Sequence, residues 1–228
     1  FSPSPPFSRL NLVWSFLRTH LRQKSILFFA TTKGARFFFE VVRRLRPGLS
    51  VMELHGKVKH MRRLEVYEGF MGSGAAALFA TDVAARGLDF SGVDWVLQVD
   101  CPDDVETYIH RVGRTARNHQ HGNSLAVFSP HEARTFLPLL RDAKLSLKKT
   151  SIHAASAINI QAKVAAEVAA DPDLKYLAER ALISFVRSNF MQPNKTVFDP
   201  STIDLPQLAH AFGLPKVPKP ASLKKLGL

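Results

Sequence analysis

Five short apolar segments alternate with amphipathic stretches of helical length, and this alternation constrains the fold more than any other feature of the chain. The apolar segments lie near residues 26–30, 51–54, 76–80, 95–99 and 124–128. Helices are expected near residues 33–45, 60–71, 104–112 and 131–142, with an earlier helix that starts at Ser8 as its N-cap. Strands that alternate with helices are typical of a parallel, doubly wound sheet. The sequence therefore predicts an α/β fold.

The residues after about position 146 differ in character and predict a small, mostly helical extension. An Ala- and Val-rich stretch runs up to Ala170, and Asp171 followed by Pro172 is a typical helix start. We expect this extension to pack on the α/β part rather than to form a separate catalytic unit. The expected divisions are a Pro-rich linker, the α/β domain, the helical extension and a basic Pro- and Lys-rich tail, at residues 1–7, 8–145, 146–214 and 215–228.

Composition restricts the partners and the compartment. The net charge is +12, and residues 1–150 carry 22 basic and 13 acidic side chains against 9 and 6 in residues 151–228. A strongly basic chain favours polyanionic partners such as nucleic acid, with a merely soluble basic surface as the alternative. The single cysteine, Cys101, excludes an internal disulfide and favours a reducing compartment. We expect no metal site, because the nine histidines lack ligand spacing, and no membrane partner, because no apolar run has transmembrane length.

Polar side chains follow the third apolar segment, where a parallel strand would end. Thr81, Asp82, Gly87 and Asp89 all come within ten residues after the apolar run 75–79. Open α/β sheets bind ligands at the carboxyl ends of their strands, where a hydroxyl and a glycine backbone suit phosphates and a carboxylate suits ribose. Taken alone, however, the stretch is more typical of a strand-to-helix turn with capping residues.

Arginines recur every three residues in the stretch 108–117. Arg111, Arg114 and Arg117 would share one face of a helical turn, next to His110. Such a group of guanidinium donors suits the charge that develops on the γ-phosphoryl oxygens during nucleotide hydrolysis. A solvated basic helix face is the alternative that the local pattern leaves open.

In this order and at this spacing, the two stretches resemble motifs of the second RecA-like domain of DEAD-box RNA helicases. Residues 81–89 resemble motif V of that family, and residues 110–117 resemble its HRxGRxxR motif VI. Residues 25–32 resemble motif IV, residues 54–56 resemble the Leu-His-Gly turn, and residues 96–102 resemble a strand that ends in Asp-x-Pro. The resemblance covers about residues 8–129 and implies a RecA-like, doubly wound parallel sheet flanked by helices.

One position departs from the family pattern. His60 lies where the family usually has the glutamine of Gln-x-x-Arg, whereas Arg63 matches the arginine. A histidine donates hydrogen bonds with a different reach and a pH-dependent charge, which puts the role of this position in doubt. An exposed helix residue is the alternative interpretation of His60.

The resemblance implies a role for each matching residue. Arg114 and Arg117 would be catalytic and would contact the phosphates of ATP, with Arg114 as the arginine finger. Gly87 and Asp89 would bind the triphosphate and the ribose. His110 and Arg111 would couple the ATP site to the RNA site. The residues that would contact the RNA backbone are Thr31, Gly56, Arg63, Thr81 and Asp82. Because Asp82 is acidic, a hydroxyl contact or a structural role suits it better than a phosphate contact.

The family's phosphate-binding and magnesium-binding motifs are absent from the sequence. Neither G-x-x-x-x-G-K-[ST] nor Asp-Glu-Ala-Asp occurs. We therefore expect the chain to be the C-terminal part of a longer protein, which uses ATP with Mg²⁺ held mainly by its N-terminal RecA-like domain. By itself the chain is expected to hydrolyse nothing.

Parts of the extension resemble that of some nucleolar DEAD-box helicases. These parts are residues 184–188, 197–199 and 208–215, and the branch acting in small-subunit ribosomal RNA maturation is the most similar. This resemblance implies pre-ribosomal RNA and snoRNA duplexes as substrates, preribosomal proteins or snoRNPs as partners, and the nucleolus of the nucleus as the location. The alternative is a non-catalytic RNA-binding or preribosome assembly module, and a DNA-directed helicase is favoured less.

Overall fold

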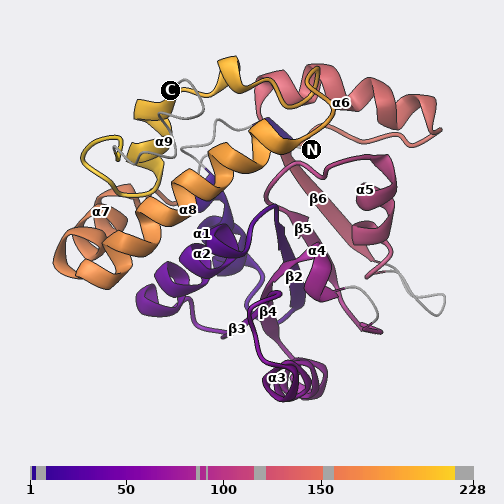
Figure 1. Cartoon of the computed structure of the whole chain (residues 1–228). Coiled ribbons are helices and arrows are strands. Elements are labelled where there is room, and N and C mark those ends of the chain that lie inside the picture. The colour runs from indigo at the N-terminus through magenta and orange to yellow at the C-terminus, as the bar shows by residue number, and fades with distance from the viewer. Residues whose placement is uncertain are drawn as a thin grey trace.

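A parallel β-sheet lies at the centre of the molecule (Figure 1). The computed structural model describes residues 2–3, 9–85, 88–90, 92–115, 122–150 and 157–218. The strands are β1 (Ser2–Pro3), β2 (Lys24–Phe29), β3 (Ser50–Leu54), β4 (Ala76–Thr81), β5 (Trp95–Gln98) and β6 (Asn123–Phe128). All of them pair in parallel, in the order β1-β6-β5-β2-β4-β3. The five predicted strands and the doubly wound sheet are confirmed.

Helices connect the strands and cover the sheet. They are α1 (Arg9–Thr19), α2 (Thr32–Leu45), α3 (His60–Gly72), α4 (Asp82–Ala85), α5 (Val105–Val112) and α6 (Pro130–Asp142). The extension adds α7 (Gln161–Ala170), α8 (Pro172–Met191), the 3₁₀ turn η3 (Pro200–Thr202) and α9 (Leu205–Ala211). Local signals explain several helix starts, since Ser129 forms a capping box with Glu132 and Asp171 accepts hydrogen bonds at the start of α8. The predicted N-cap Ser8 lies outside the described residues.

The alternation of side chains along each strand divides the core between the two faces of the sheet. Leu27, Phe29, Phe79 and Val99 face the layer that contains α1 and α2. The other face packs against α3, and α5 and α6 form a third cluster around Phe128. Central strands β2 and β4 are buried along their whole length, which explains the apolar runs that make up most of their sequences.

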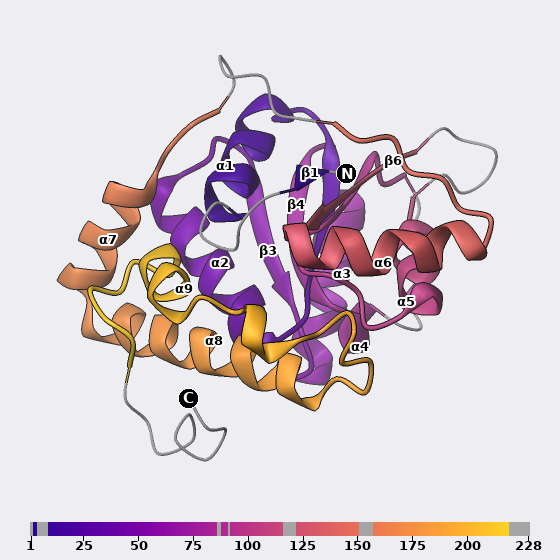
Figure 2. The same ribbon diagram turned by 90° about the horizontal axis from the view of Figure 1, so that it is seen from above.

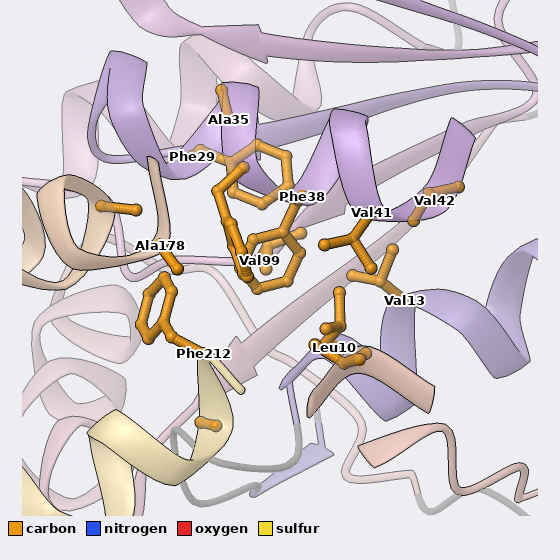
Figure 3. Close-up of a cluster of buried hydrophobic side chains, with 14 of the residues drawn as sticks. Leu10, Val13, Phe29, Ala35, Phe38, Val41, Val42, Val99, Ala178 and Phe212 are labelled. Atoms are coloured by element: carbon orange, nitrogen blue, oxygen red, sulfur yellow. The ribbon is translucent and has the colours of Figure 1, made fainter. Parts of the chain in front are cut away.

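The helical extension packs on the same face as α1 and α2. Figure 2 shows α7, α8 and α9 grouped beside α2 and away from α5. Phe212, at the end of α9, lies with its ring centroid 5.1 Å from that of Phe37 and 6.3 Å from that of Phe38. Figure 3 shows Phe212 and Ala178 pointing into the cluster that contains Phe38 and Val41. The run of three phenylalanines in α2, Phe37 to Phe39, therefore belongs to the core, and the sheet and the extension share one hydrophobic cluster.

The helices α2 and α8 lie antiparallel. Arg44, in the last turn of α2, donates from Nη2 to Asp171 Oδ2 at the start of α8, at 2.6 Å. The hydrogen bond from Arg44, together with those from the backbone N–H groups of Leu174 and Asp173, lowers the pKa of the Asp171 carboxyl. This contact fixes the end of α2 to the beginning of α8, so the two helices run in opposite directions from it.

Candidate functional site

The carboxyl ends of the strands meet at one edge of the sheet, and predicted site residues lie along that edge. Thr31 follows β2, Gly56 follows β3 and Thr81 is the last residue of β4. Because β4 lies between β2 and β3, Thr81 lies between the turns that carry Thr31 and Gly56. Strands β4 and β3 lie on one side of β2 and strands β5 and β6 lie on the other, and the point where the strand order reverses is where doubly wound sheets bind ligands.

The residues predicted to bind RNA differ in accessibility. Thr31 is nearly buried and caps α2, because its Oγ1 accepts a hydrogen bond from Gly34 N at 3.0 Å. Gly56 is exposed, and no atom lies within 4 Å of the position that a Cβ would take. Arg63 is half-buried on α3, and His60 is exposed at the first position of that helix. Gly56, Arg63 and His60 thus present an accessible surface, whereas Thr31 shapes the adjoining turn.

Arg111 joins α5 to the carboxyl ends of two strands. Its Nε and Nη2 each donate to a carboxylate oxygen of Asp82 at 2.7 Å, and its Nη1 donates to the carbonyl of Asp100 at 2.9 Å. The guanidinium lies 5.4 Å from the centroid of the Phe28 ring, and the residue is 1% exposed. A bidentate pair of this kind fixes both partners in orientation as well as in distance. Asp82 is therefore held by the protein itself.

Arg114 reaches the segment that contains Asp89. Its Nη1 donates to the Leu88 carbonyl at 2.9 Å and its Nε donates to the His110 carbonyl at 3.2 Å. Asp89 is exposed, and its carbonyl accepts from the hydroxyl of Tyr67 at 2.6 Å. The fold therefore brings together two of the residues predicted to bind ATP, one from each motif.

The predicted single face of arginines is wrong in the described residues. Helix α5 ends at Val112, Gly113 follows as the C-cap, and Arg114 lies in the turn beyond it. Arg111 points into the protein because the Asp82 carboxylate and the Asp100 carbonyl lie there, whereas Arg114 is only half-buried. The other two residues of the predicted nucleotide site, Gly87 and Arg117, lie outside the described residues.

Comparisons with known proteins agree with this arrangement. Residues 8–119 match the family model of the helicase conserved C-terminal domain, and residues 171–220 match that of the C-terminal extension of ATP-dependent rRNA helicase SPB4-like proteins. A solved structure described as Mss116p DEAD-box helicase domain 2 bound to an RNA duplex is similar over 100% of this chain and 92% of its own, with a TM-score of 0.81 and 26% identity. The chain is a C-terminal domain of the DEAD-box helicase family.

Curated relatives of this helicase domain are similar over almost its whole length. The human probable ATP-dependent RNA helicase DDX10 is 44% identical over 218 residues, which are 96% of this chain and 25% of the relative. The ATP-dependent RNA helicase HCA4 of Saccharomyces cerevisiae is 42% identical over 215 residues, which are 94% of this chain and 28% of the relative. The chain thus spans about a quarter of the length of these relatives.

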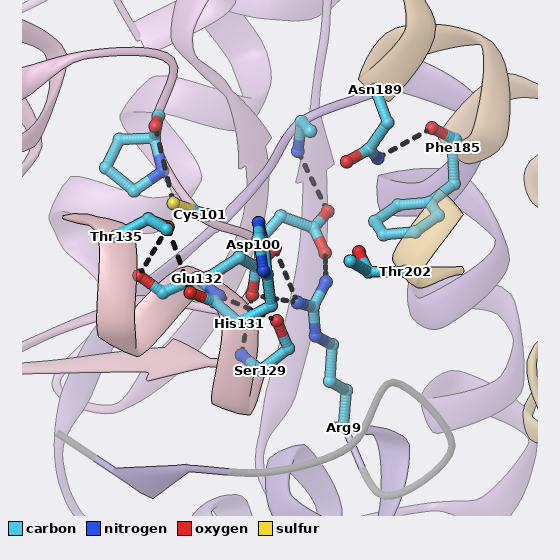
Figure 4. Close-up of polar contacts among 12 residues, drawn as sticks. Arg9, Asp100, Cys101, Ser129, His131, Glu132, Thr135, Phe185, Asn189 and Thr202 are labelled. Carbon is cyan, nitrogen blue, oxygen red and sulfur yellow. Dashed lines mark hydrogen bonds and ion pairs between the residues drawn. The ribbon is translucent and has the colours of Figure 1, made fainter. Parts of the chain in front are cut away.

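An ionic cluster that no sequence motif indicated joins the helicase domain to its extension. Arg9 donates from Nη1 to Asp100 Oδ1 at 2.6 Å and from Nη2 to Glu132 Oε2 at 3.0 Å, as Figure 4 shows. Burial lowers the pKa of this guanidinium, but the charges of Glu132 and Asp100 outweigh burial and the pKa is raised. The guanidinium also lies 5.4 Å from the ring centroid of Phe185 on α8. The only signal was Asp-x-Pro at Asp100, because Arg9 belongs to no recognised motif.

A cavity of about 330 Å³ lies beside this cluster, between the start of α6 and the extension. Arg9, Pro130 and Arg134 line one side, and Asn189 and Gln207 line the other. The cavity is separate from the edge that carries Thr81 and Asp82, neither of which lines it. It marks where the extension meets the domain.

In the ranges that the structure describes, no group of three or more His, Cys, Asp or Glu side chains is arranged to hold a metal ion. No helix among them is both long and apolar enough to span a membrane.

Proposed function

We propose that this chain forms one half of the catalytic centre of an ATP-dependent RNA helicase that remodels ribosomal RNA. The observation that carries the proposal is the contact of Arg114 with the Leu88 carbonyl, next to Asp89, at the sheet edge that also bears Thr81 and Asp82. This contact supports the proposal because it holds the Arg114 guanidinium beside the residue that precedes the exposed Asp89. An N-terminal RecA-like domain of the same protein supplies the other half.

In this proposal the nucleotide binds across the two domains. Asp89 accepts hydrogen bonds from the ribose, Gly87 lies against the triphosphate, and the other domain holds most of the phosphate charge and the Mg²⁺. Closure of the domains brings Arg114 and Arg117 onto the phosphates, where a guanidinium stabilises the charge that develops during transfer. The Leu88 carbonyl contact supports this role because it orients Arg114 before the domains close.

RNA is held through its backbone, so binding depends little on base sequence. The accessible positions of Gly56 and Arg63 support direct contact, and Thr31 and Thr81 line the same edge. Asp82 is bound twice by Arg111, which favours a structural role for this carboxylate over a phosphate contact. Arg111 and His110 then transmit domain closure between the nucleotide and RNA sites through the ends of β4 and β5.

The extension supports ribosomal RNA as the substrate. Its family model carries the description of an rRNA helicase, and the relatives that span the whole chain are named as RNA helicases. We infer that the protein acts in the nucleolus on pre-ribosomal RNA and snoRNA duplexes, with preribosomal proteins or snoRNPs as partners.

The test is RNA-stimulated ATP hydrolysis by the full-length protein that contains this chain, with Arg114→Ala beside the wild type. An arginine finger contributes about three to five orders of magnitude to turnover, so we expect a loss of that size with RNA binding retained. Arg141→Ala, an exposed arginine in the last turn of α6, is the matched control and leaves turnover unchanged. A wild type that binds RNA and never hydrolyses ATP would instead make the protein an assembly module.

A further inference from the structure

Four basic side chains from three elements gather beside the proposed RNA site. Lys33 and Arg36 lie at the start of α2, Lys57 lies in the turn after β3, and Arg180 lies on α8 of the extension. Partial burial, followed by the charges of Lys57, Arg36 and Arg180, lowers the pKa of the Lys33 ammonium. Each of the other three charges is therefore close enough to repel that of Lys33. Arg36, Lys57 and Arg180 are exposed to solvent.

The antiparallel packing of α2 and α8 explains why Arg180 lies there. The two helices are fixed together at the Arg44–Asp171 ion pair. At a rise of about 1.5 Å per residue, Arg180 lies about 14 Å along α8 from Asp171, and Lys33 lies about 16 Å back along α2 from Arg44. Both side chains therefore reach the same end of the helix pair. This end adjoins the strand edge, because α2 begins directly after β2.

Among the residues that the structure describes, the cluster has no acidic partners of its own. Within the described part of the chain, none of the four side chains forms an ion pair with a carboxylate. At the other end of the same helix pair, Arg43 and Arg44 are paired with Glu40, and Arg44 also with Asp171. Like charges held together without counter-charges favour an anionic ligand. Of the two ends of the α2–α8 pair, the end near the strand edge is the one where the described basic side chains cluster without ion pairs.

The neighbours of these residues indicate which anion. Lys33 is two residues from Thr31, and Lys57 directly follows Gly56, both of which are proposed to contact the RNA backbone. The cluster therefore continues the same edge toward the extension. A phosphodiester backbone that passes Gly56 and Thr31 would next meet Lys57, Lys33 and then Arg180.

We propose that Lys33, Arg36, Lys57 and Arg180 form a phosphate-binding continuation of the RNA site, so that the C-terminal extension itself holds the RNA backbone. This inference rests on the proposed RNA-binding function of the domain. It assigns to α8 a contact with substrate in addition to its packing on α2. Since the contacts are to phosphates, they add affinity without sequence preference.

The test is the affinity of the 228-residue chain for a labelled RNA duplex and for single strands of different sequence, measured over a series of salt concentrations. Arg180→Ala is expected to weaken binding to all these RNAs alike and to reduce the slope of log affinity against log salt by about 1. Lys175→Ala is the matched control, because Lys175 is also exposed on α8 but lies near the Asp171 end. It leaves both affinity and slope unchanged.

Arg63→Ala separates this inference from the proposal on which it rests. If Arg63→Ala weakens RNA binding while Arg180→Ala behaves like Lys175→Ala, the domain binds RNA and the extension does not, which overturns the inference alone. A wild-type chain that binds none of the RNAs at any salt concentration overturns both. Because Arg180 is exposed, its removal should leave the unfolding transition of the chain unchanged, so a folding defect cannot imitate the expected result.

Discussion

Arg111 is the largest fully buried side chain among the described residues, and its charge is balanced by the carboxylate of Asp82. Asp82 accepts from it twice, the Asp100 carbonyl accepts once, and the Phe28 ring lies against the guanidinium. A charge in this position is tolerated only when all its partners are present, because an unpaired buried ion is far more costly than a paired one. Arg111 therefore holds α5 against the ends of β4 and β5 and stabilises the fold.

Replacing Arg111 with alanine should lower the free energy of unfolding by about 3 kcal/mol, because the Asp82 carboxylate loses both of its donors. Arg111→Lys should fall between this variant and the wild type, since it keeps the charge and loses the bidentate geometry. Urea unfolding of the chain measures the change, and His110→Ala, at an exposed neighbouring position, serves as the control. Equal stability of the Arg111→Ala and His110→Ala variants would contradict a structural role for Arg111.

Arg111 and Arg114 show how much of the site could be predicted from the sequence at the scale of single residues. The spacing suggested that Arg111 and Arg114 both face phosphoryl charge, and the resemblance implied a coupling role for Arg111 and an arginine finger for Arg114. Neither could distinguish a buried side chain from a half-buried one. That distinction depends on Asp82 and Asp100, which belong to other strands and are brought to Arg111 only by the folded sheet. Arg9 was missed for the same reason, because its partners Asp100 and Glu132 are 91 and 123 residues away along the chain.

At the scale of elements, the hydrophobic periodicity of the sequence was sufficient to predict the sheet. The predicted strand near 76–80 is β4, Ala76–Thr81, and the predicted helix near 60–71 is α3, His60–Gly72. These elements carry strong local signals in their apolar pattern and in the turns that bound them. The helix predicted near 104–112 is α5, Val105–Val112, but it ends before Arg114, so Arg111 and Arg114 do not share the helical face that their spacing suggested.

The turn after α9 depends on a glycine that no local pattern made evident. Gly213 has a φ of +71°, and a Cβ at this position would lie 3.1 Å from both Cγ1 and the carbonyl oxygen of Val164, and 3.1 Å from Cγ2 of Val168. The glycine thus lets the end of α9 approach α7 closely while it turns the chain. Gly213 therefore lies where α9 contacts α7, two helices of the extension.

Gly213→Ala should therefore lower the free energy of unfolding by about 2 kcal/mol, from the left-handed backbone and the overpacking against α7 together. Thermal or urea unfolding followed by circular dichroism measures the effect. Gly74→Ala is the matched control, because no atom lies within 4 Å of its Cβ position and its change should stay within about 0.5 kcal/mol. If both variants unfold at the same urea concentration, α9 does not pack against α7 in solution as described.

At the scale of the whole molecule, the sheet domain and the extension depend on one core. The cluster on the α1 and α2 side contains side chains from the sheet, from α2 and from all three helices of the extension. Phe37 and Phe38 are each in contact with Phe212, and Ala178 on α8 is fully buried. The sequence indicated that the extension packs on the domain, but not that it covers the aromatic side chains of α2. That face would be exposed without it.

A chain that ends at residue 150 tests this shared core, because it keeps the sheet and loses α7, α8 and α9. We expect it to expose the apolar face of α2 around Phe37 and Val41, to bind a hydrophobic dye and to associate as its concentration rises, since soluble monomers rarely expose a contiguous apolar patch of that extent. Size-exclusion chromatography with light scattering measures the association. A chain that ends at residue 218 retains all three helices and should stay monomeric. If the chain that ends at residue 150 is also monomeric and unfolds as cooperatively as the full chain, the sheet domain is stable alone, and the extension remains only for its proposed contact with RNA.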